Sequence, residues 1–401
     1  MKTQEVIASV IDAQKEDIDK TPEGLPREIL DDVPVVKNFC SIITGIRRCG
    51  KSTLMLQIFK KSKEKSLFLK FEDIRLSGFE ASDFARLSSE IEKRDVKILF
   101  FDEIQIVDKW EIFINQKLNE GYQVFITGSN ASLMSKELGT HLTGRHLSSE
   151  LHPFSYSEFL AFRELENNVG SLNDYLQMGG MPEYVKNYRG IILQQLIDDI
   201  LYRDIVVRHN IRNVNALREI TVYLLSNVGK PVSARRLTGL FGITSTSTVT
   251  DYFAYLKNSY VIDFVPQFDY SVKAQSRNPK KVYAMDLGIY HQIKTTFTED
   301  YGRQLENAVY LHLRRKHKEL FFFKRNGECD FIVMNKGKAD RCVQVCYRID
   351  DLNMKREMEG LKSALEYFGL NEGEIVTHDQ SDLFEYNGRT ITLIPAWKFM
   401  M

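Results

Sequence analysis

The chain is poor in cysteine, proline and tryptophan, and it has no excess of charge of one sign. Its 401 residues include five cysteines, nine prolines and two tryptophans, and 54 basic side chains balance 54 acidic ones. The cysteines are odd in number and form no Cys-x-x-Cys pair, which argues against disulfides or a zinc site and favours reduced thiols. Zero net charge means that any surface for nucleic acid must be local.

Long hydrophobic runs are also missing. No stretch approaches the length of a membrane span, and the first 20 residues lack the apolar core of a signal peptide. We therefore expect a cytoplasmic protein with no membrane partner. There is no internal repeat or low-complexity tract, and a chain of this length is expected to form two or three domains.

What the sequence does contain is a complete phosphate-binding loop, Gly45-Ile46-Arg47-Arg48-Cys49-Gly50-Lys51-Ser52-Thr53. Its glycines permit a tight loop whose backbone N–H groups hold a phosphate, at the positive N-terminus of the following helix. In this pattern Lys51 reaches the β- and γ-phosphates of ATP, and Ser52 places its hydroxyl on Mg²⁺. An apolar run before the loop and a helical pattern after it favour nucleotide binding over a loop without a ligand. Arg47 and Arg48 occupy unconstrained positions, so we assign them no catalytic role.

A second motif lies about 50 residues downstream, as expected for the acidic partner of a P-loop. Four apolar residues, Ile-Leu-Phe-Phe, lead directly into Asp102 and Glu103, which is typical of a buried strand that carries acids at its end. We expect Asp102 to hold Mg²⁺, directly or through water, and Glu103 to accept a proton from the attacking water. Taken alone, this pattern also occurs in surface turns.

Two further candidate sites are less specific. Ser129 and Asn130 end the next expected strand, so either side chain is a candidate to orient the attacking water or, alternatively, to cap a helix. Arg145 is a candidate to neutralise charge in the transition state, in its own subunit or a neighbour's, with a surface ion pair as the alternative.

The pattern along the chain predicts five segments. They are a helical lead-in (1–32), a P-loop core (33–152), a helical lid (153–212), a winged helix (213–270) and a small α/β domain (271–401). In the core, short apolar runs alternate with helical patterns, which indicates a parallel sheet covered on both faces. In the fourth segment, helix, short helix, turn, helix and strand follow one another as in a winged helix-turn-helix. Such modules bind DNA or serve only in packing, and the sequence leaves both open.

The P-loop, the Asp-Glu strand end, the polar end of the next strand and the helical lid together resemble the AAA+ superfamily. Phe-Phe-Asp-Glu-Ile-Gln, Ile-Thr-Gly-Ser-Asn, Leu-Thr-Gly-Arg and Gly-Gly-Met-Pro-Glu are similar to one prokaryotic family, the uncharacterised AAA ATPases with a C-terminal DUF4143 domain. The resemblance covers nearly the whole chain. It implies an AAA+ type P-loop fold, ATP and Mg²⁺ as cofactors, and a homo-oligomer as a candidate assembly.

The tail of that family resembles a PD-(D/E)xK nuclease fold, in which carboxylates hold Mg²⁺ and a lysine offsets the phosphate charge. In this chain Glu306 and Asp330 match the acids, and Gln344-Val345-Cys346 stands where Glu/Gln-x-Lys is expected. Because a thiol cannot supply the fixed positive charge of lysine, we expect a degenerate module with weak or absent cleavage.

The sequence therefore predicts an ATPase coupled to a winged helix and a degenerate nuclease-like module. Two alternatives stay open. One is a nucleotide-gated scaffold for nucleic acid or protein with little turnover, and the other is an ATP-regulated nuclease. DNA is a candidate partner through the winged helix and the C-terminal domain.

Overall fold

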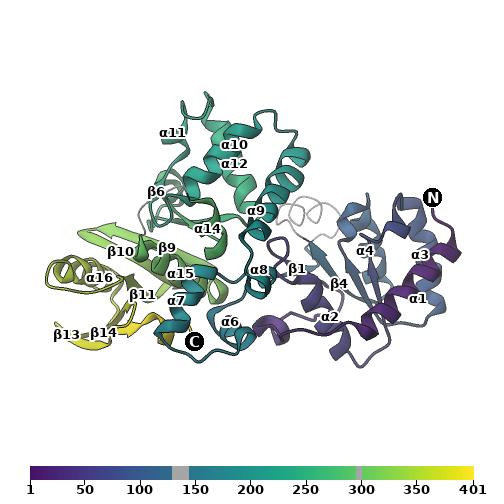
Figure 1. Ribbon diagram of the computed structural model, residues 1–401, viewed down its shortest axis with the longest axis horizontal. Helices are drawn as coiled ribbons and strands as arrows, with labels where there is room; N and C mark the ends of the chain where they lie inside the picture. Colours follow the sequence, from purple (N-terminus) through teal and green to yellow (C-terminus); the bar gives the residue numbers. More distant parts are fainter. Residues whose placement is uncertain (129–143, 295–299) are drawn as a thin grey trace. The chain divides into compact units, whose positions relative to one another are not determined.

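The computed structural model describes residues 1–128, 144–294 and 300–401 (Figure 1). The chain divides into two compact units, Met1–His152 and Pro153–Met401. We describe each unit by itself. No helix of the described residues is both long and apolar enough to cross a membrane.

The first unit is built on a sheet with strand order β2-β3-β4-β1-β5, in which every neighbouring pair is parallel. Its strands are β1 (Cys40–Thr44), β2 (Ser66–Lys70), β3 (Ile98–Asp102), β4 (Gln123–Gly128) and β5 (His146–Glu150). Its α-helices are α1 (Gln4–Lys20), α2 (Lys51–Lys61), α3 (Phe84–Lys93) and α4 (Trp110–Asn119). This architecture confirms the expected parallel-sheet P-loop fold.

The sheet is covered on both faces, which explains why its central strands are apolar at successive positions. One face carries Leu99 and Phe101 and packs in the core that includes residues of α1, α3 and α4. The opposite face carries Phe100, which stacks on Phe125 and meets Phe59 of α2 edge-on. Burial of β3 on both sides therefore fixes where its last residue, Asp102, emerges.

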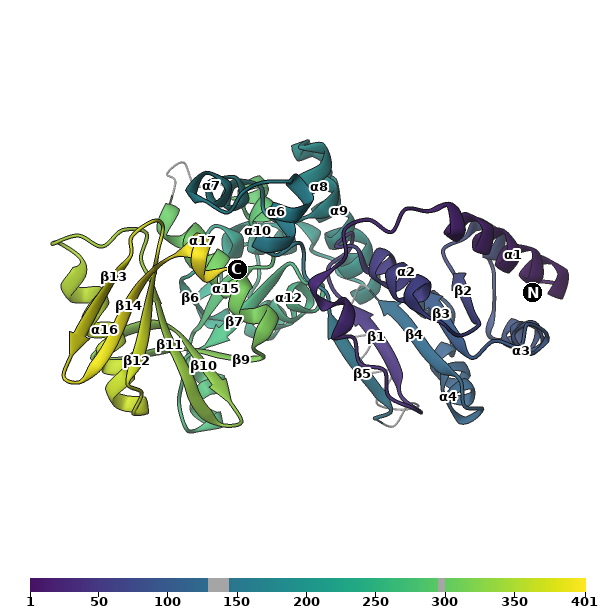
Figure 2. The ribbon, with the colours of Figure 1, turned by 90° about the horizontal axis from the view of Figure 1, so that it is seen from below.

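Helix α1 is an integral part of the first unit. Its residues Ile7, Val10 and Ile11 are buried in the same core as β2 and β3, and Figure 2 shows the helix beside α3. The sequence analysis treated residues 1–32 as a lead-in to the core. The structure instead has this segment cover one face of the sheet.

The second unit begins with helices. In chain order they are α6 (Tyr156–Arg163), α7 (Val169–Met178), α8 (Pro182–Asn187), α9 (Gly190–Asp199), a π-helix (Ile200–Val207), α10 (Val214–Leu225), α11 (Ala234–Leu237), α12 (Thr246–Asn258), α13 (Val272–Arg277), α14 (Leu287–Ile293), α15 (Tyr301–Lys316), α16 (Met354–Phe368) and α17 (Ala396–Phe399). Helix α7, in the segment expected to be a lid, packs on α14 and α15 of this unit. Its role as a lid over a nucleotide stays a prediction.

Two sheets complete the second unit. The larger has the order β13-β14-β12-β11-β10-β9, with strands β9 (Glu319–Arg325), β10 (Gly327–Asn335), β11 (Lys338–Val345), β12 (Glu372–Thr377), β13 (Asp382–Tyr386) and β14 (Arg389–Pro395). Helix α16 packs across it and buries Leu361, Ala364 and Leu365 (Figure 2). The smaller sheet has the order β6-β8-β7, with β6 (Pro231–Val232), β7 (Ile262–Pro266) and β8 (Lys280–Ala284).

The pairing of β8 differs from the sequence-based expectation. We expected this strand in the C-terminal α/β block, but it pairs antiparallel with β6 and β7. The apolar pattern of a strand shows that it is buried and not which sheet it joins, so the sequence alone did not reveal this partnership. The pairing of β8 places Lys281 beside Asp330 of β10, a strand of the larger sheet.

Phe100 tests the packing of the first unit, because its ring is fully buried between Phe125 and Phe59. We expect Phe100→Ala to lower the free energy of unfolding of this unit by about 3–5 kcal/mol, the usual cost of such a cavity. Urea unfolding followed by Trp110 fluorescence, in a Trp397→Phe background, reports on the first unit alone. Ile74→Ala, at a side chain that is 83% exposed, is the control and should change it by under about 0.5 kcal/mol. A loss below about 1 kcal/mol at Phe100 would contradict the packing.

Candidate functional site

The P-loop connects the end of β1 to the start of α2, and its glycines are required by the backbone. Gly45 and Gly50 have φ angles of 144° and 100°, which side chains other than glycine rarely adopt. A Cβ atom on Gly45 would also lie 2.1 Å from the carbonyl oxygen of Leu151. The two fixed glycines of the motif therefore stand where the turn needs them.

Lys51 is the first residue of α2, and its side chain is directed into the loop. Its Nζ donates hydrogen bonds to the carbonyl oxygens of Gly45, at 3.0 Å, and Ile46, at 2.9 Å. Only 6% of the residue is exposed. A buried ammonium at a helix N-terminus, beside a loop of backbone N–H groups, is suited to bind a phosphate.

The carboxylate of Asp102 accepts hydrogen bonds from polar side chains at the carboxyl edge of the sheet. Its Oδ1 accepts hydrogen bonds from Ser52 Oγ, at 3.1 Å, and from Thr127 Oγ1, at 2.6 Å. The hydroxyl of Thr127 also accepts a hydrogen bond from the backbone N–H of Glu103, at 3.0 Å. Residues from α2, β3 and β4 are thus joined beside the P-loop.

The same carboxylate provides a test for a metal ion. Asp102 is 1% exposed, and its Oδ2 is buried with no hydrogen-bond partner in the part of the chain that the structure describes. A buried carboxylate oxygen without a partner is costly unless a cation or water compensates it. Together with Ser52 Oγ, it offers the hard oxygen ligands that Mg²⁺ prefers, so these residues fit the ion.

Both the backbone conformation of Glu103 and the pKa of its side chain are typical of a functional residue. It adopts a left-handed conformation, with φ 58° and ψ 36°, which a residue with a side chain rarely occupies. Burial raises the pKa of its carboxyl, and the charge of Lys51 opposes this shift in part. The charges of Asp102 and Glu72 raise the pKa further, by less. A raised pKa brings a carboxylate closer to the range that suits a general base.

A further contact to the P-loop comes from a residue that the sequence analysis missed. Arg27 is 5% exposed, and it donates hydrogen bonds to the carbonyl oxygens of Cys49, at 2.8 Å, and His152, at 2.7 Å. Gln57 of α2 holds the same segment through the carbonyl oxygens of Glu23 and Leu25. No motif marks Arg27, so its role depends on a contact that only the fold creates.

Arg145 does not lie near the P-loop within its own chain. Its carbonyl oxygen accepts a hydrogen bond from the backbone N–H of Cys40, the first residue of β1, whereas the P-loop follows the last. At about 3.3 Å per residue, a strand of this length separates the two ends of the sheet. The guanidinium contacts Asn115 and Asn119 of α4. This geometry does not support a role at the P-loop of its own subunit. A role in a neighbouring subunit stays a prediction, with a surface contact as the alternative.

The other candidate residues either belong to the P-loop or follow β4 in the sequence. Asn130 and Ser129 lie outside the described residues. Within the loop, Ile46 and Cys49 are buried, whereas Arg48, Ser52 and Thr53 are exposed and Arg47 is half-buried. A cavity of about 630 Å³ opens beside Ser52, Thr53 and Asp102.

Comparison with known families matches residues 37–160 to the AAA domain and residues 169–300 to a domain of unknown function (DUF8612). The first match supports nucleotide binding. The second does not correspond to the expected DUF4143 domain, which stays a prediction. A solved structure, Cdc6p from Pyrobaculum aerophilum, has 14% sequence identity and a TM-score of 0.27, covering 56% of this chain and 80% of that one.

Two curated relatives are similar over most of their length. One is an uncharacterized protein of Haemophilus influenzae, 30% identical over 338 residues that cover 78% of this chain and 84% of the relative. The other is the uncharacterized protein MJ1544 of Methanocaldococcus jannaschii, 30% identical over 419 residues that cover 96% of this chain and 93% of the relative. The chain, which carries an AAA domain, therefore belongs to the family that includes MJ1544.

Proposed function

We propose that this chain is a Mg²⁺-dependent ATPase of the AAA+ type that works in the cytoplasm. The observation that supports it best is the network of Ser52, Asp102 and Thr127, which reaches the backbone of Glu103 beside the P-loop. A phosphate-binding loop, oxygen ligands for a metal and a carboxylate with a raised pKa are the parts that phosphoryl transfer to water requires.

Each residue has an assigned role in this proposal. The loop from Gly45 to Thr53 holds the phosphates, with Lys51 at the β- and γ-phosphates. Ser52 and Asp102 hold Mg²⁺, and Glu103 accepts the proton of the attacking water. When bound, Mg²⁺ supplies positive charge that stabilises the transferring phosphoryl group.

Two assignments extend beyond this network. Asn130, or its neighbour Ser129, orients the attacking water at the end of β4. Arg145 contributes from a neighbouring copy in a homo-oligomer, as AAA+ proteins assembled in rings do, and not from the chain that holds the nucleotide.

Glu103→Gln tests the assignment of the general base. Because the amide keeps the size of the side chain and cannot accept the proton, we expect turnover to fall at least about 100-fold. Binding of ATP should remain unchanged, because no phosphate ligand is removed. Phosphate release at saturating ATP and nucleotide titration measure the two quantities, with Glu92→Gln, an exposed glutamate of the same unit, as the control.

The outcomes of this experiment separate the open alternatives. Turnover that is unchanged in Glu103→Gln contradicts the role of that residue. A chain that binds ATP but shows no turnover in either form contradicts the ATPase and favours the nucleotide-gated scaffold.

Arg27→Met tests whether this residue positions the P-loop. The substitution removes the guanidinium that joins the carbonyls of Cys49 and His152, and we expect the Kd for ATP to rise at least about tenfold, or about 1.4 kcal/mol. Arg94→Met is the matched control, since Arg94 is partly buried and paired with Glu90 and Asp12, but directly follows α3. Equal loss of affinity in both variants, or none in either, would contradict a specific role for Arg27.

A second candidate function is nucleic-acid binding by residues 213–284. The order α10, β6, α11, α12, β7 and β8, with both outer strands paired to β8, supports a winged helix. A cavity of about 400 Å³ beside α12 is lined by the exposed cations Arg235, Arg277 and Lys280. Local positive charge of this kind provides phosphate contacts in a chain whose net charge is zero.

Replacing Arg235, Arg277 and Lys280 together by alanine tests this surface. Filter binding of duplex DNA over a range of salt should show weaker binding at every concentration, and the slope of log K against log salt should fall by up to about 2.7, or 0.9 for each lost phosphate contact. The control removes three exposed lysines of the first unit, Lys63, Lys65 and Lys93. If both triple variants bind alike, the assigned surface is wrong.

A further inference from the structure

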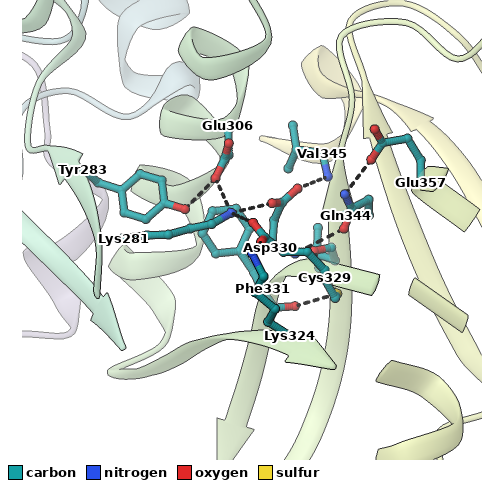
Figure 3. A network of polar contacts seen from close by, with 12 residues as sticks. Lys281, Tyr283, Glu306, Lys324, Cys329, Asp330, Phe331, Gln344, Val345 and Glu357 are labelled. Carbon is teal, nitrogen blue, oxygen red and sulfur yellow. Dashed lines mark hydrogen bonds and ion pairs between the residues drawn. The ribbon is translucent and has the colours of Figure 1, made fainter. Parts of the chain in front are cut away.

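The second unit contains a polar cavity of about 830 Å³ at the position of the nuclease-like motif. Glu306, Asp330, Gln344 and Cys346 all line it, together with Lys281. Figure 3 shows Lys281 between the carboxylates of Glu306 and Asp330, with Gln344 close by. The fold thus brings together the motif residues from Glu306 to Cys346 and adds to them one cation, Lys281, that lies 25 positions before Glu306 in the sequence.

Cys346 provides no positive charge in this cavity. Burial, together with the charge of Glu357, raises the pKa of its thiol to about 11, so the group is neutral at physiological pH. Its Sγ lies 3.1 Å from the carbonyl oxygen of Arg348. The position at which such nucleases carry a lysine therefore has no charge to offset a phosphate.

Lys281 of β8 supplies a cation from a different strand. Its Nζ lies 2.7 Å from Asp330 Oδ1, 2.9 Å from Glu328 Oε1 and 3.1 Å from Glu306 Oε1. The side chain is only 2% exposed, so this ammonium has exchanged its water shell for three carboxylates. Burial alone would lower the pKa of Lys281, but Asp330 and the other carboxylates raise it well above its usual value. The ammonium is therefore a permanent charge.

The carboxylates around this ammonium have further donors. Tyr283 donates its hydroxyl to Glu306 Oε1, at 2.7 Å, and the backbone N–H of Val345 donates to Asp330 Oδ2, at 3.0 Å. Lys324 pairs with the second oxygen of Glu328, at 3.1 Å. The three acids are thus compensated by protein groups alone.

A divalent metal, which the nuclease resemblance implies, does not fit this arrangement. Metal ions hold oxygen ligands at about 2.0–2.6 Å, and the site between the three carboxylates is taken by an ammonium at 2.7–3.1 Å. Among the described residues, no group of three or more His, Cys, Asp or Glu side chains is arranged to hold a metal ion. The cavity is also lined by six carboxylates and only four cationic side chains, so it does not attract a polyanion.

We infer that the ammonium of Lys281 replaces a divalent metal as the permanent counter-cation of Glu306, Glu328 and Asp330. The cavity consequently binds no divalent metal, and the domain does not cleave nucleic acid. It also links β8 of the small sheet to α15 and to β10 of the larger one. This inference is independent of the proposed ATPase, because it concerns only residues of the second unit.

Mn²⁺ binding, measured by electron paramagnetic resonance without nucleotide, tests the inference. All proteins carry Asp102→Asn, which removes the metal ligand of the first unit. We expect no Mn²⁺ at this cavity in the parent. Lys281→Met, which removes the charge and keeps the length of the side chain, should gain one Mn²⁺ per chain at concentrations at which the parent binds none. Addition of Asp330→Asn should abolish the gain.

Lys324→Met is the matched control, because this lysine pairs with the same Glu328 from an exposed position and should create no site. A Mn²⁺ ion bound by the parent and lost with Asp330→Asn overturns the inference, as does a folded Lys281→Met variant that binds none. If Lys281→Met does not fold, the comparison of the parent with Asp330→Asn decides alone. Supercoiled plasmid incubated with Mg²⁺ or Mn²⁺ should remain uncut, and nicking that Asp330→Asn abolishes would likewise overturn it.

Discussion

The buried carboxylate of Asp102 is the constraint on which the first unit depends. It lies at the end of a strand packed on both faces, so the residue cannot turn away to water. Two hydroxyl groups compensate one of its oxygens, and in the described chain no protein group compensates the other. Because an uncompensated buried oxygen is costly, the unit has a local demand for a cation, which the proposed Mg²⁺ would meet. The fold and its proposed ligand are therefore linked through one side chain.

In the second unit, the negative charge of the acidic side chains is compensated by the protein itself and not by a ligand. Its three acids, of which Asp330 is buried, receive a lysine of the same chain, so their charge is compensated without a ligand. An internal cation requires only that its strand be held in place, which the antiparallel pairing of β8 with β6 and β7 provides. In the first unit one carboxylate oxygen of Asp102 is left for the proposed metal, whereas the acids of the second unit are paired with protein groups.

Much of the first unit could be predicted because its signals are local. The P-loop and the Asp102-Glu103 pair are contiguous in sequence, and the alternation of short apolar runs with helical patterns indicated the parallel sheet that the structure shows. The contacts of Arg27 and Lys281 could not be predicted, because each joins segments far apart in the chain through side chains that no motif marks.

The parallel arrangement of the strands explains why some residues of the candidate site could be predicted from the sequence and why Arg145 could not. All strands of such a sheet end at the same edge, so residues at the carboxyl ends of β1, β3 and β4 meet without any further information. Arg145 precedes its strand and must therefore lie at the opposite edge, paired beside Cys40. The number of residues between Arg145 and a motif does not show at which end of the sheet it lies. Whether a residue precedes or follows its strand does show this. An arginine before β5 can meet a γ-phosphate only across an interface with another copy, which makes the catalytic use of Arg145 and the oligomeric state a single question.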